Sequence, residues 1–249
     1  MASFGGPYSN HLVALAFAAK ENGLKSIGYV RSNLGEPITP SLKEALDYGM
    51  ELIYLGRTHF QIKKQEMIQA NTVDPNSKTY LVDEGGYGNL GALGASTIIK
   101  DMDVGTSKTN PLYAYDTIIC AVGTGTMIAG IINAAAPLQK IIGIPVLKNE
   151  GSIEQEIKYL MADPLKPFQL LHQFHQGGYA KTSPEQIHFM NAFWDANKIP
   201  TDIVYTGKVF YAVSQLLQDH YFKDADKILV IHSGGLQGNR SLTKGTLQF

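Results

Sequence analysis

The segment Gly123-Thr124-Gly125-Thr126 combines glycines and hydroxyl side chains between an apolar run at 117–122 and a helix-like stretch at 126–135. Glycines let the backbone approach a phosphate closely, and a helix N-terminus adds N–H donors and partial positive charge. No Gly-Lys-Ser/Thr of a Walker loop follows, and Ile128 stands where a G-x-G-x-x-G dinucleotide fingerprint has its third glycine. The segment predicts a phosphate-binding loop, with a tight structural turn as the alternative.

Three further Gly-rich segments adjoin predicted strands or helices. Residues 4–11 lead into a helix-like stretch, where Ser9 or Asn10 is a natural N-cap and nearby N–H groups can face a carboxylate. Residues 84–89 and 232–238 each follow an apolar run, and Ser233 precedes two glycines that let its hydroxyl approach a ligand. Because ligands bind where parallel strands end, four such loops favour a ligand site over plain turns.

Some single residues have less distinctive surroundings. Tyr179 and Tyr205 lie in Gly-containing segments, and a packed amphipathic ring is the commoner role for any one tyrosine. His175 and His232 lack the paired spacing of metal ligands, so no metal site is predicted. Cys120 lies inside an apolar run, which predicts a buried and unreactive thiol.

The elements that must position these loops alternate along the chain. Short runs rich in Ile and Val predict strands, and the stretches between them predict helices, which together indicate βαβ units and parallel sheets in an α/β fold. The predicted strands are 26–31, 51–55, 79–82, 117–122, 141–146 and 228–232, and the predicted helices are 11–22, 40–48, 59–70, 90–100, 126–135, 153–161, 184–197 and 209–221. Gly23 and Gly49 stand where left-handed residues terminate helices.

Length and composition limit the class of protein. The chain has 249 residues, of which 44% are hydrophobic and 17% charged, and its net charge is −1, so a whole-chain basic footprint for nucleic acid is missing. A single cysteine excludes an internal disulfide and fits a reducing compartment, and without a membrane-length or signal-like run we expect a cytoplasmic protein. A polar stretch at 101–111 predicts a crossing between a smaller domain, 5–104, and a larger one, 105–249.

Seven segments in order resemble the 1-aminocyclopropane-1-carboxylate deaminase/D-cysteine desulfhydrase family, which uses pyridoxal 5′-phosphate (PLP). They are GGPYSNH at 5–11, DEGGYGNLGALG at 83–94, AVGTGTMIAG at 121–130, GIPVLK at 143–148, GGYAK at 177–181, VYTGK at 204–208 and IHSGG at 231–235. The resemblance covers nearly the whole chain and implies the two-domain tryptophan synthase β-like fold (PLP fold type II). It also implies a small amino-acid substrate and a homodimer.

The resemblance also implies roles for individual residues. Backbone donors of Gly123, Thr124, Gly125 and Thr126 would hold the PLP phosphate, Asn10 would bond the ring hydroxyl, and Ser233 would lie near the pyridine nitrogen. Ser9, Asn10 and His11 would face the substrate, with Ser9 near its carboxylate or Cα and able to take part in proton transfer. Tyr179 and Tyr205 would flank the ring and the substrate.

Two positions bear on the substrate. Family members that open the cyclopropane ring have Glu after the tyrosine matching Tyr205 and Leu before the final Gly-Gly, whereas this chain has Thr206 and Ser233. Neutral hydroxyls resemble the D-cysteine desulfhydrase branch and would leave the pyridine nitrogen less protonated than a carboxylate would. We therefore expect β-elimination from a D-amino acid, although Tyr8 stands where both branches have Gln.

The family's PLP-binding lysine lies in an S-G-N-K-x-R-K-like motif before the segment matching 5–11. No lysine of this sequence stands in that motif, and the first lysine is Lys20. We expect a missing N-terminal segment; a PLP- or amino-acid-binding protein without normal turnover and a lysine recruited from elsewhere are the alternatives. A cysteine synthase-like or dehydratase-like PLP enzyme remains a further reading, and a dinucleotide-binding protein a distant one.

Overall fold

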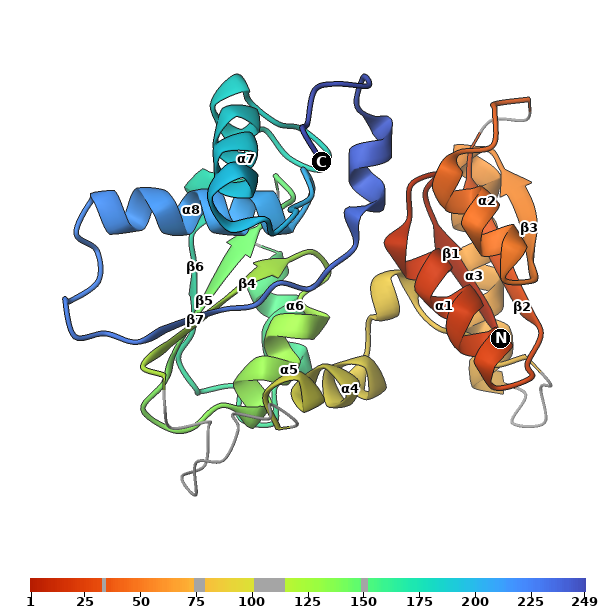
Figure 1. The fold of residues 1–249 in the computed structure, drawn as a ribbon. Helices are drawn as coiled ribbons and strands as arrows, with labels where there is room; N and C mark the ends of the chain where they lie inside the picture. Colours follow the sequence, from red (N-terminus) through yellow and green to blue (C-terminus); the bar gives the residue numbers. More distant parts are fainter. Residues whose placement is uncertain (33–34, 74–78, 101–114, 149–151) are drawn as a thin grey trace. The chain divides into compact units, whose positions relative to one another are not determined.

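The computed structural model describes residues 1–32, 35–73, 79–100, 115–148 and 152–249, without side chains for 71–73. This part of the chain forms two compact units, Met1–Tyr87 and Gly88–Phe249 (Figure 1). The predicted domain boundary at 104/105 lies outside the described residues and stays a prediction. No helix in the described ranges is long and apolar enough to cross a membrane.

The first unit is a parallel sheet covered by helices on both faces. Its strands follow the order β1-β2-β3, and a single parallel bridge from Ala2 to Leu81 extends it beyond β1. The elements are β1 (Ala2–Gly5), α1 (Asn10–Glu21), β2 (Ser26–Arg31), α2 (Pro40–Asp47), β3 (Met50–Leu55), α3 (Arg57–Val73) and the short 3₁₀ turn η1 (Glu84–Gly86).

Alternation along the strands divides this unit into two cores. Val30 faces Leu12 and Leu42, so α1 and α2 cover one face of the sheet. The neighbouring Tyr29 faces the other way, where it joins Phe60 of α3 in a second apolar cluster. The period of two along a strand therefore assigns each helix its face.

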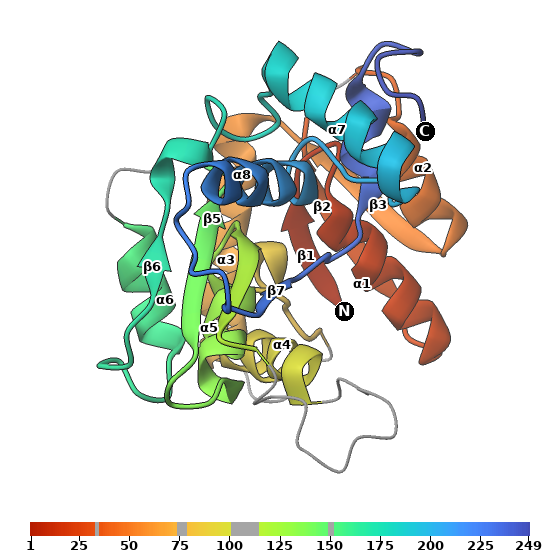
Figure 2. The same cartoon turned by 60° about the vertical axis from the view of Figure 1, so that its left-hand side comes forward.

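The second unit holds a four-stranded parallel sheet with the order β6-β5-β4-β7, which places β4 between β5 and β7. Figure 2 labels β5, β6 and β7 of this sheet. Its elements are α4 (Asn89–Lys100), β4 (Thr117–Val122), α5 (Thr126–Ala134), β5 (Lys140–Pro145), α6 (Ile153–Leu160), β6 (Gln169–Leu170), α7 (Pro184–Asn197), α8 (Thr206–Gln218) and β7 (Ile228–Val230), with 3₁₀ turns η3 (His172–Phe174) and η4 (Leu236–Ser241).

Helices α5 and α8 cover opposite faces of this sheet (Figure 1). Ile119 and Ile144 pack against Val209 of α8. On the other face, a Cβ added to Gly143 would lie 2.7 Å from the Cδ1 atom of Ile128 in α5. Helix α4 in turn crosses α5 so closely that a Cβ at Gly130 would lie 2.3 Å from the backbone of α4. The sheet is thus buried on both faces, as its continuous apolar strands predict.

Most predicted elements are confirmed, with shifts of up to three residues at their ends. The predicted strand at 79–82 is wrong: only Leu81 makes a bridge before the chain turns into η1. Strands β1 and β6 have no strand signal in the sequence, because neither has an apolar run of ordinary strand length. Gly23 and Gly49 have the predicted left-handed backbone, with φ of +64° and +90°.

Candidate functional site

The loop between β4 and α5 leaves a helix N-terminus open. Gly125 is the N-cap of α5 with φ of +86°, and as a glycine it has no side chain to cap the first turn of this helix. The hydroxyls of Thr124 and Thr126 lie 3.0 Å apart and share a hydrogen bond. A Cβ at Gly125 would lie 2.8 Å from the Cγ1 atom of Ile157, so this backbone conformation and this space both require glycine. The geometry fits a phosphate held by backbone N–H groups.

Two tyrosine rings lie beside this loop. A Cβ at Gly123 would lie 3.4 Å from the Cε1 atom of Tyr205, so the absence of a side chain lets that ring approach the backbone. The ring of Tyr179 meets Tyr205 edge to face, with centroids 6.3 Å apart and planes at 76°. Tyr179 is 46% exposed. The structure therefore brings together three residues that the sequence proposed separately, while their roles stay predictions.

The turn at residues 202–206, which carries Tyr205, is held by the buried carboxylate of Asp202. Asp202 is fully buried, and its oxygens accept hydrogen bonds from the backbone N–H groups of Val204, Tyr205 and Thr206 at 2.7–3.1 Å. The Thr206 hydroxyl donates to the same carboxylate at 2.8 Å. Asp202 thus satisfies backbone N–H groups at the start of α8 and fixes the backbone that carries Tyr205.

Burial and hydrogen bonding act in opposite directions on Asp202. Desolvation raises the pKa of this carboxyl above its ordinary value, and the N–H and hydroxyl donors of the turn lower it in part. Sequence reasoning missed Asp202. A signal was present, because Asp side chains commonly bond backbone N–H groups two residues further along in turns.

The Ser233 loop follows β7, the neighbour of β4 in the sheet, so this loop and the Gly123–Thr126 loop leave adjacent parallel strands at their carboxyl ends. Ser233 is exposed. Beside it, His232 Nε2 lies 2.8 Å from the Pro200 carbonyl, and His232 Nδ1 accepts a bond from the Gly234 N–H. His232 therefore shapes the turn through its ring nitrogens.

In the first unit, Ser9 is the N-cap of α1, and its hydroxyl oxygen accepts a bond from the Leu12 N–H at 3.2 Å. Asn10 begins the helix. A Cβ at Gly5 would lie 2.7 Å from the Ser9 Oγ atom, so the tight turn into α1 depends on that glycine. The predicted N-cap is confirmed at Ser9.

His11 lies at the end of a short hydrogen-bond chain. The Ser3 hydroxyl donates to the Val82 carbonyl at 2.7 Å, so at its 2.7 Å contact with His11 it accepts from Nε2–H. That assignment leaves Nδ1 of the ring as an acceptor. Burial lowers the pKa of His11 to about 4, and the charge of Glu84 opposes this shift. The imidazole is neutral at physiological pH.

The predicted site residues fall into two groups, and the structure defines each group within its own unit. Ser9, Asn10 and His11 belong to Met1–Tyr87. The Gly123–Thr126 loop belongs to Gly88–Phe249, together with Tyr179, Tyr205 and Ser233.

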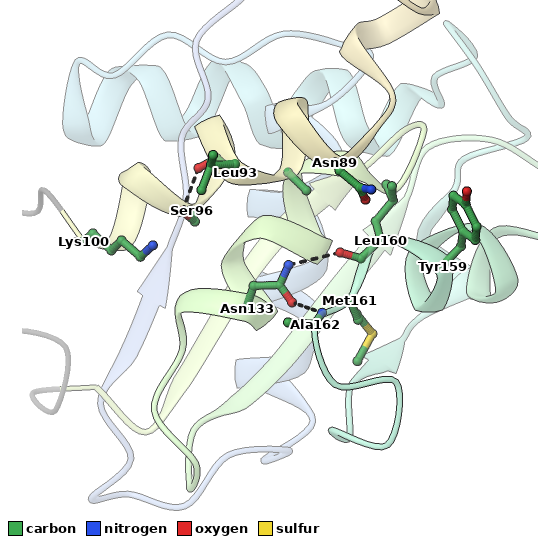
Figure 3. Close-up of a pocket in the computed structure, with 10 residues that line it drawn as sticks. Asn89, Leu93, Ser96, Lys100, Asn133, Tyr159, Leu160, Met161 and Ala162 are labelled. Atoms are coloured by element: carbon green, nitrogen blue, oxygen red, sulfur yellow. Dashed lines mark hydrogen bonds between the residues drawn. The ribbon is translucent and has the colours of Figure 1, made fainter. Parts of the chain in front are cut away.

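A cavity of about 480 Å³ lies elsewhere in the second unit, along α4 and the final residues of α5 and α6 (Figure 3). Asn133 projects there, and its amide donates to the Leu160 carbonyl and accepts from the Ala162 N–H. None of the predicted site residues lines this cavity, which is bounded by Asn89, Ala92, Leu93, Ser96, Lys100, Asn133, Tyr159, Leu160, Met161 and Ala162.

Comparison with known proteins agrees with this geometry. A protein of Thermotoga maritima, provisionally named a 1-aminocyclopropane-1-carboxylate deaminase, is 26% identical, with 94% of this chain and 77% of that protein covered. The D-cysteine desulfhydrase of Serratia proteamaculans is 23% identical, with 93% and 74% covered.

The crystal structure of an ACC deaminase homologue shares the fold, with a TM-score of 0.77 at 24% identity over 96% of this chain and 74% of that one. This likeness confirms the predicted PLP fold type II. The family model for pyridoxal-phosphate dependent enzymes matches residues 4–234. The chain therefore belongs to the pyridoxal-phosphate dependent enzyme family, and 1-aminocyclopropane-1-carboxylate deaminases and D-cysteine desulfhydrases are among its relatives.

Proposed function

We propose that this protein is a PLP-dependent lyase or deaminase of small amino acids, and that β-elimination from a D-amino acid such as D-cysteine is its preferred reaction. The observation that carries the proposal is the open N-terminus of α5, where Gly125 caps the helix without a side-chain acceptor and the Tyr205 ring lies against Gly123. Its relatives include D-cysteine desulfhydrases, which agrees with this choice.

The residues of the second unit fit the cofactor. Backbone N–H groups of the Gly123–Thr126 loop would hold the phosphate, and Tyr205 and Tyr179 would border the ring. Ser233, at the end of the adjacent strand, would face the pyridine nitrogen. When bound, PLP supplies an electron sink that makes the Cα–H of an amino acid acidic.

The first turn of α1 would handle the substrate. Ser9 and Asn10 stand at a helix N-terminus, which favours a carboxylate, and the Ser9 hydroxyl would take part in moving a proton at Cα. His11 is held as a neutral ring with Nδ1 as an acceptor, so it would receive a hydrogen bond without adding charge.

Thr206 changes how substrate preference is assigned. This residue is fully buried, its hydroxyl donates to Asp202, and the same oxygen accepts from the Asp202 N–H at 2.8 Å. Its hydroxyl is therefore committed to the turn. The preference for a neutral partner at the pyridine nitrogen then depends on Ser233, whose side chain is exposed.

The first test is a product assay with PLP present. D-cysteine, L-cysteine and 1-aminocyclopropane-1-carboxylate are supplied separately, and keto acid, ammonia and sulfide are measured. We expect sulfide and pyruvate from D-cysteine. Turnover of 1-aminocyclopropane-1-carboxylate in preference to D-cysteine would reject the proposed reaction, and failure of PLP to bind would reject the proposed function altogether.

Gly125→Ala and Gly245→Ala form a matched pair for the cofactor site. Both positions have a left-handed backbone, with φ of +86° and +91°, but only a Cβ at Gly125 meets other atoms within 4 Å. We expect Gly125→Ala to abolish PLP binding and Gly245→Ala to retain it. Equal loss in both variants would mean that general backbone strain, and not the phosphate loop, explains the effect.

The attachment of PLP is tested by borohydride reduction and peptide mapping, on this chain and on a version extended upstream. Labelling of an upstream lysine would support the family reaction, and labelling within residues 1–249 would assign the bond to a lysine of this chain. PLP binding without labelling or turnover in either version would favour the alternative, a PLP- or amino-acid-binding protein.

A further inference from the structure

Lys208 is a fully buried cation in the first part of α8. Its ammonium donates to the carbonyl oxygens of Gly178 at 2.6 Å and His175 at 2.8 Å, and to that of Val146 at 3.5 Å. An ammonium has three N–H donors, so the three carbonyls match its full capacity. Burial of an ammonium is costly unless its hydrogen bonds are made, which ties this residue to one geometry.

The three carbonyls belong to two separate segments. Val146 directly follows β5, whereas His175 and Gly178 belong to the loop that carries Tyr179. The Lys208 side chain therefore joins α8, the end of a central strand and the Tyr179 loop. These segments lie 30–62 residues apart from Lys208 along the chain.

The Tyr179 loop has an unusual backbone. Residues on both sides of the tyrosine have positive φ, including the non-glycine residues Gln176 at 53° and Ala180 at 54°. Such conformations persist where the surroundings enforce them. The turn has two backbone hydrogen bonds of its own, from the Gly178 N–H to His175 and from the Lys181 N–H to Gly178. The Lys208 ammonium bonds to the same two carbonyls, His175 and Gly178, and anchors them to the core.

We infer that Lys208 is a positioning residue whose ammonium holds the Tyr179 loop so that the Tyr179 ring meets Tyr205 beside the Gly123–Thr126 loop. It acts through these two rings and does not itself touch the cofactor. Its consequence for PLP binding rests on the proposed function, whereas its effect on the tyrosine pair does not.

The same contacts also bear on whether Lys208 could take the place of the family's PLP-binding lysine. An amine that bonds covalently to PLP must first be unprotonated with its lone pair free to attack, but Lys208 is held as an ammonium whose three N–H groups point to carbonyls of the protein interior. Burial lowers its pKa to about 8, and the nearby charge of Asp202 opposes that shift, so the ammonium is the major form at neutral pH.

The test compares Lys208→Met with Lys166→Met. Lys166 is a matched control because its ammonium also donates to two backbone carbonyls, those of Ile132 and Ala135, at the far end of α5 from Gly125. Protein labelled with ¹³C-tyrosine, without PLP, reports the ring-to-ring nuclear Overhauser effect of the tyrosine pair, assigned with Tyr179→Phe and Tyr205→Phe. Amide hydrogen exchange of residues 175–181 is measured on the same samples.

In Lys208→Met we expect the Tyr179–Tyr205 Overhauser effect to vanish and exchange in the loop to accelerate by about tenfold or more, whereas Lys166→Met keeps both as in the wild type. An Overhauser effect that persists in Lys208→Met, or that disappears in both variants, would overturn the inference. If Lys208→Met does not fold, Lys208→Arg replaces it: the charge stays, but a planar fork cannot meet three converging carbonyls, so a weakened effect is expected.

PLP titration separates this inference from the proposed function. We expect the Kd for PLP to rise about tenfold in Lys208→Met and to stay unchanged in Lys166→Met. Failure of the wild type to bind PLP would reject the proposed function, and the Overhauser comparison would still decide the role of Lys208. A disrupted tyrosine pair with unchanged PLP affinity would reject the positioning role toward the cofactor.

Discussion

Replacement of Asp202 by Asn should loosen the turn that carries Tyr205. In the wild type, Oδ1 accepts from the N–H and hydroxyl of Thr206, Oδ2 accepts from the Val204 N–H, and the Tyr205 N–H reaches both oxygens. An Asn side chain oriented to keep the Thr206 bonds would place its NH₂ group against the Val204 N–H. The isosteric change therefore turns one acceptor into a donor facing a donor.

The magnitude follows from this count. A hydrogen bond to a charged group contributes about 1.5–3 kcal/mol, and one such bond, to the Val204 N–H, is lost outright. Removal of the buried charge returns part of that loss, because desolvation raises the pKa of Asp202 and so opposes its charged form. We expect a net decrease of about 2 kcal/mol in the free energy of unfolding. For a chain of this size that corresponds to a fall in Tm of about 4–8 °C.

The assay is thermal and urea unfolding of Asp202→Asn beside Asp116→Asn. Asp116 is the control because its exposed carboxylate accepts one backbone N–H, from Lys227 at 2.8 Å, so its replacement should change stability by less than about 0.5 kcal/mol. PLP affinity should fall in Asp202→Asn alone. An Asp202→Asn protein as stable as the wild type would refute the reasoning that this carboxylate fixes the turn.

Three further outcomes are expected. Burial lowers the pKa of folded-state His11 to about 4, so as pH falls the unfolded chain protonates this imidazole before the folded protein does. The free energy of unfolding should therefore decrease between about pH 6.5 and 4, by up to ~3 kcal/mol. Urea unfolding of His11→Asn across that range should show a weaker pH dependence than the wild type. Gly130→Ala should lower the free energy of unfolding by about 1–3 kcal/mol, since the new Cβ would lie 2.3 Å from the Ala92 carbonyl oxygen, and a variant of wild-type stability would show that α4 and α5 separate easily. Burial raises the pKa of Cys120 to about 12, so this thiol should react with a thiol reagent only after urea is added, and rapid labelling of the native protein would contradict its burial.

Local sequence patterns determined most of the elements. The apolar run at 117–122 and the Pro-initiated helix at 184–197 match β4 and α7 at both ends, because a continuous Ile- and Val-rich run and a capped helix start are both local signals. The loop Gly123-Thr124-Gly125-Thr126 could also be interpreted from sequence alone. Its glycines, the preceding strand and the following helix are contiguous.

Other parts of the site depend on residues that are distant along the chain. The sequence indicates Tyr179 and Tyr205 only as separate candidate residues. Their edge-to-face contact arises because their segments pack together in the fold. In the sequence, nothing around Lys208 distinguishes it from a surface lysine. Only the fold brings the carbonyls of Val146, His175 and Gly178 to its ammonium. Neither arrangement has a signal within a short window of sequence.

Strand β1 also depends on residues that are distant along the chain. The residues Ala2–Gly5 contain one large apolar side chain, Phe4, and no run that predicts a strand. They form one because parallel pairing with β2 and the bridge to Leu81 satisfy their backbone, and the Ser3 hydroxyl then joins Val82 and His11. Periodicity and capping are local properties that the sequence displays directly, whereas the partners of a buried ammonium, carboxylate or imidazole exist only once distant segments have packed.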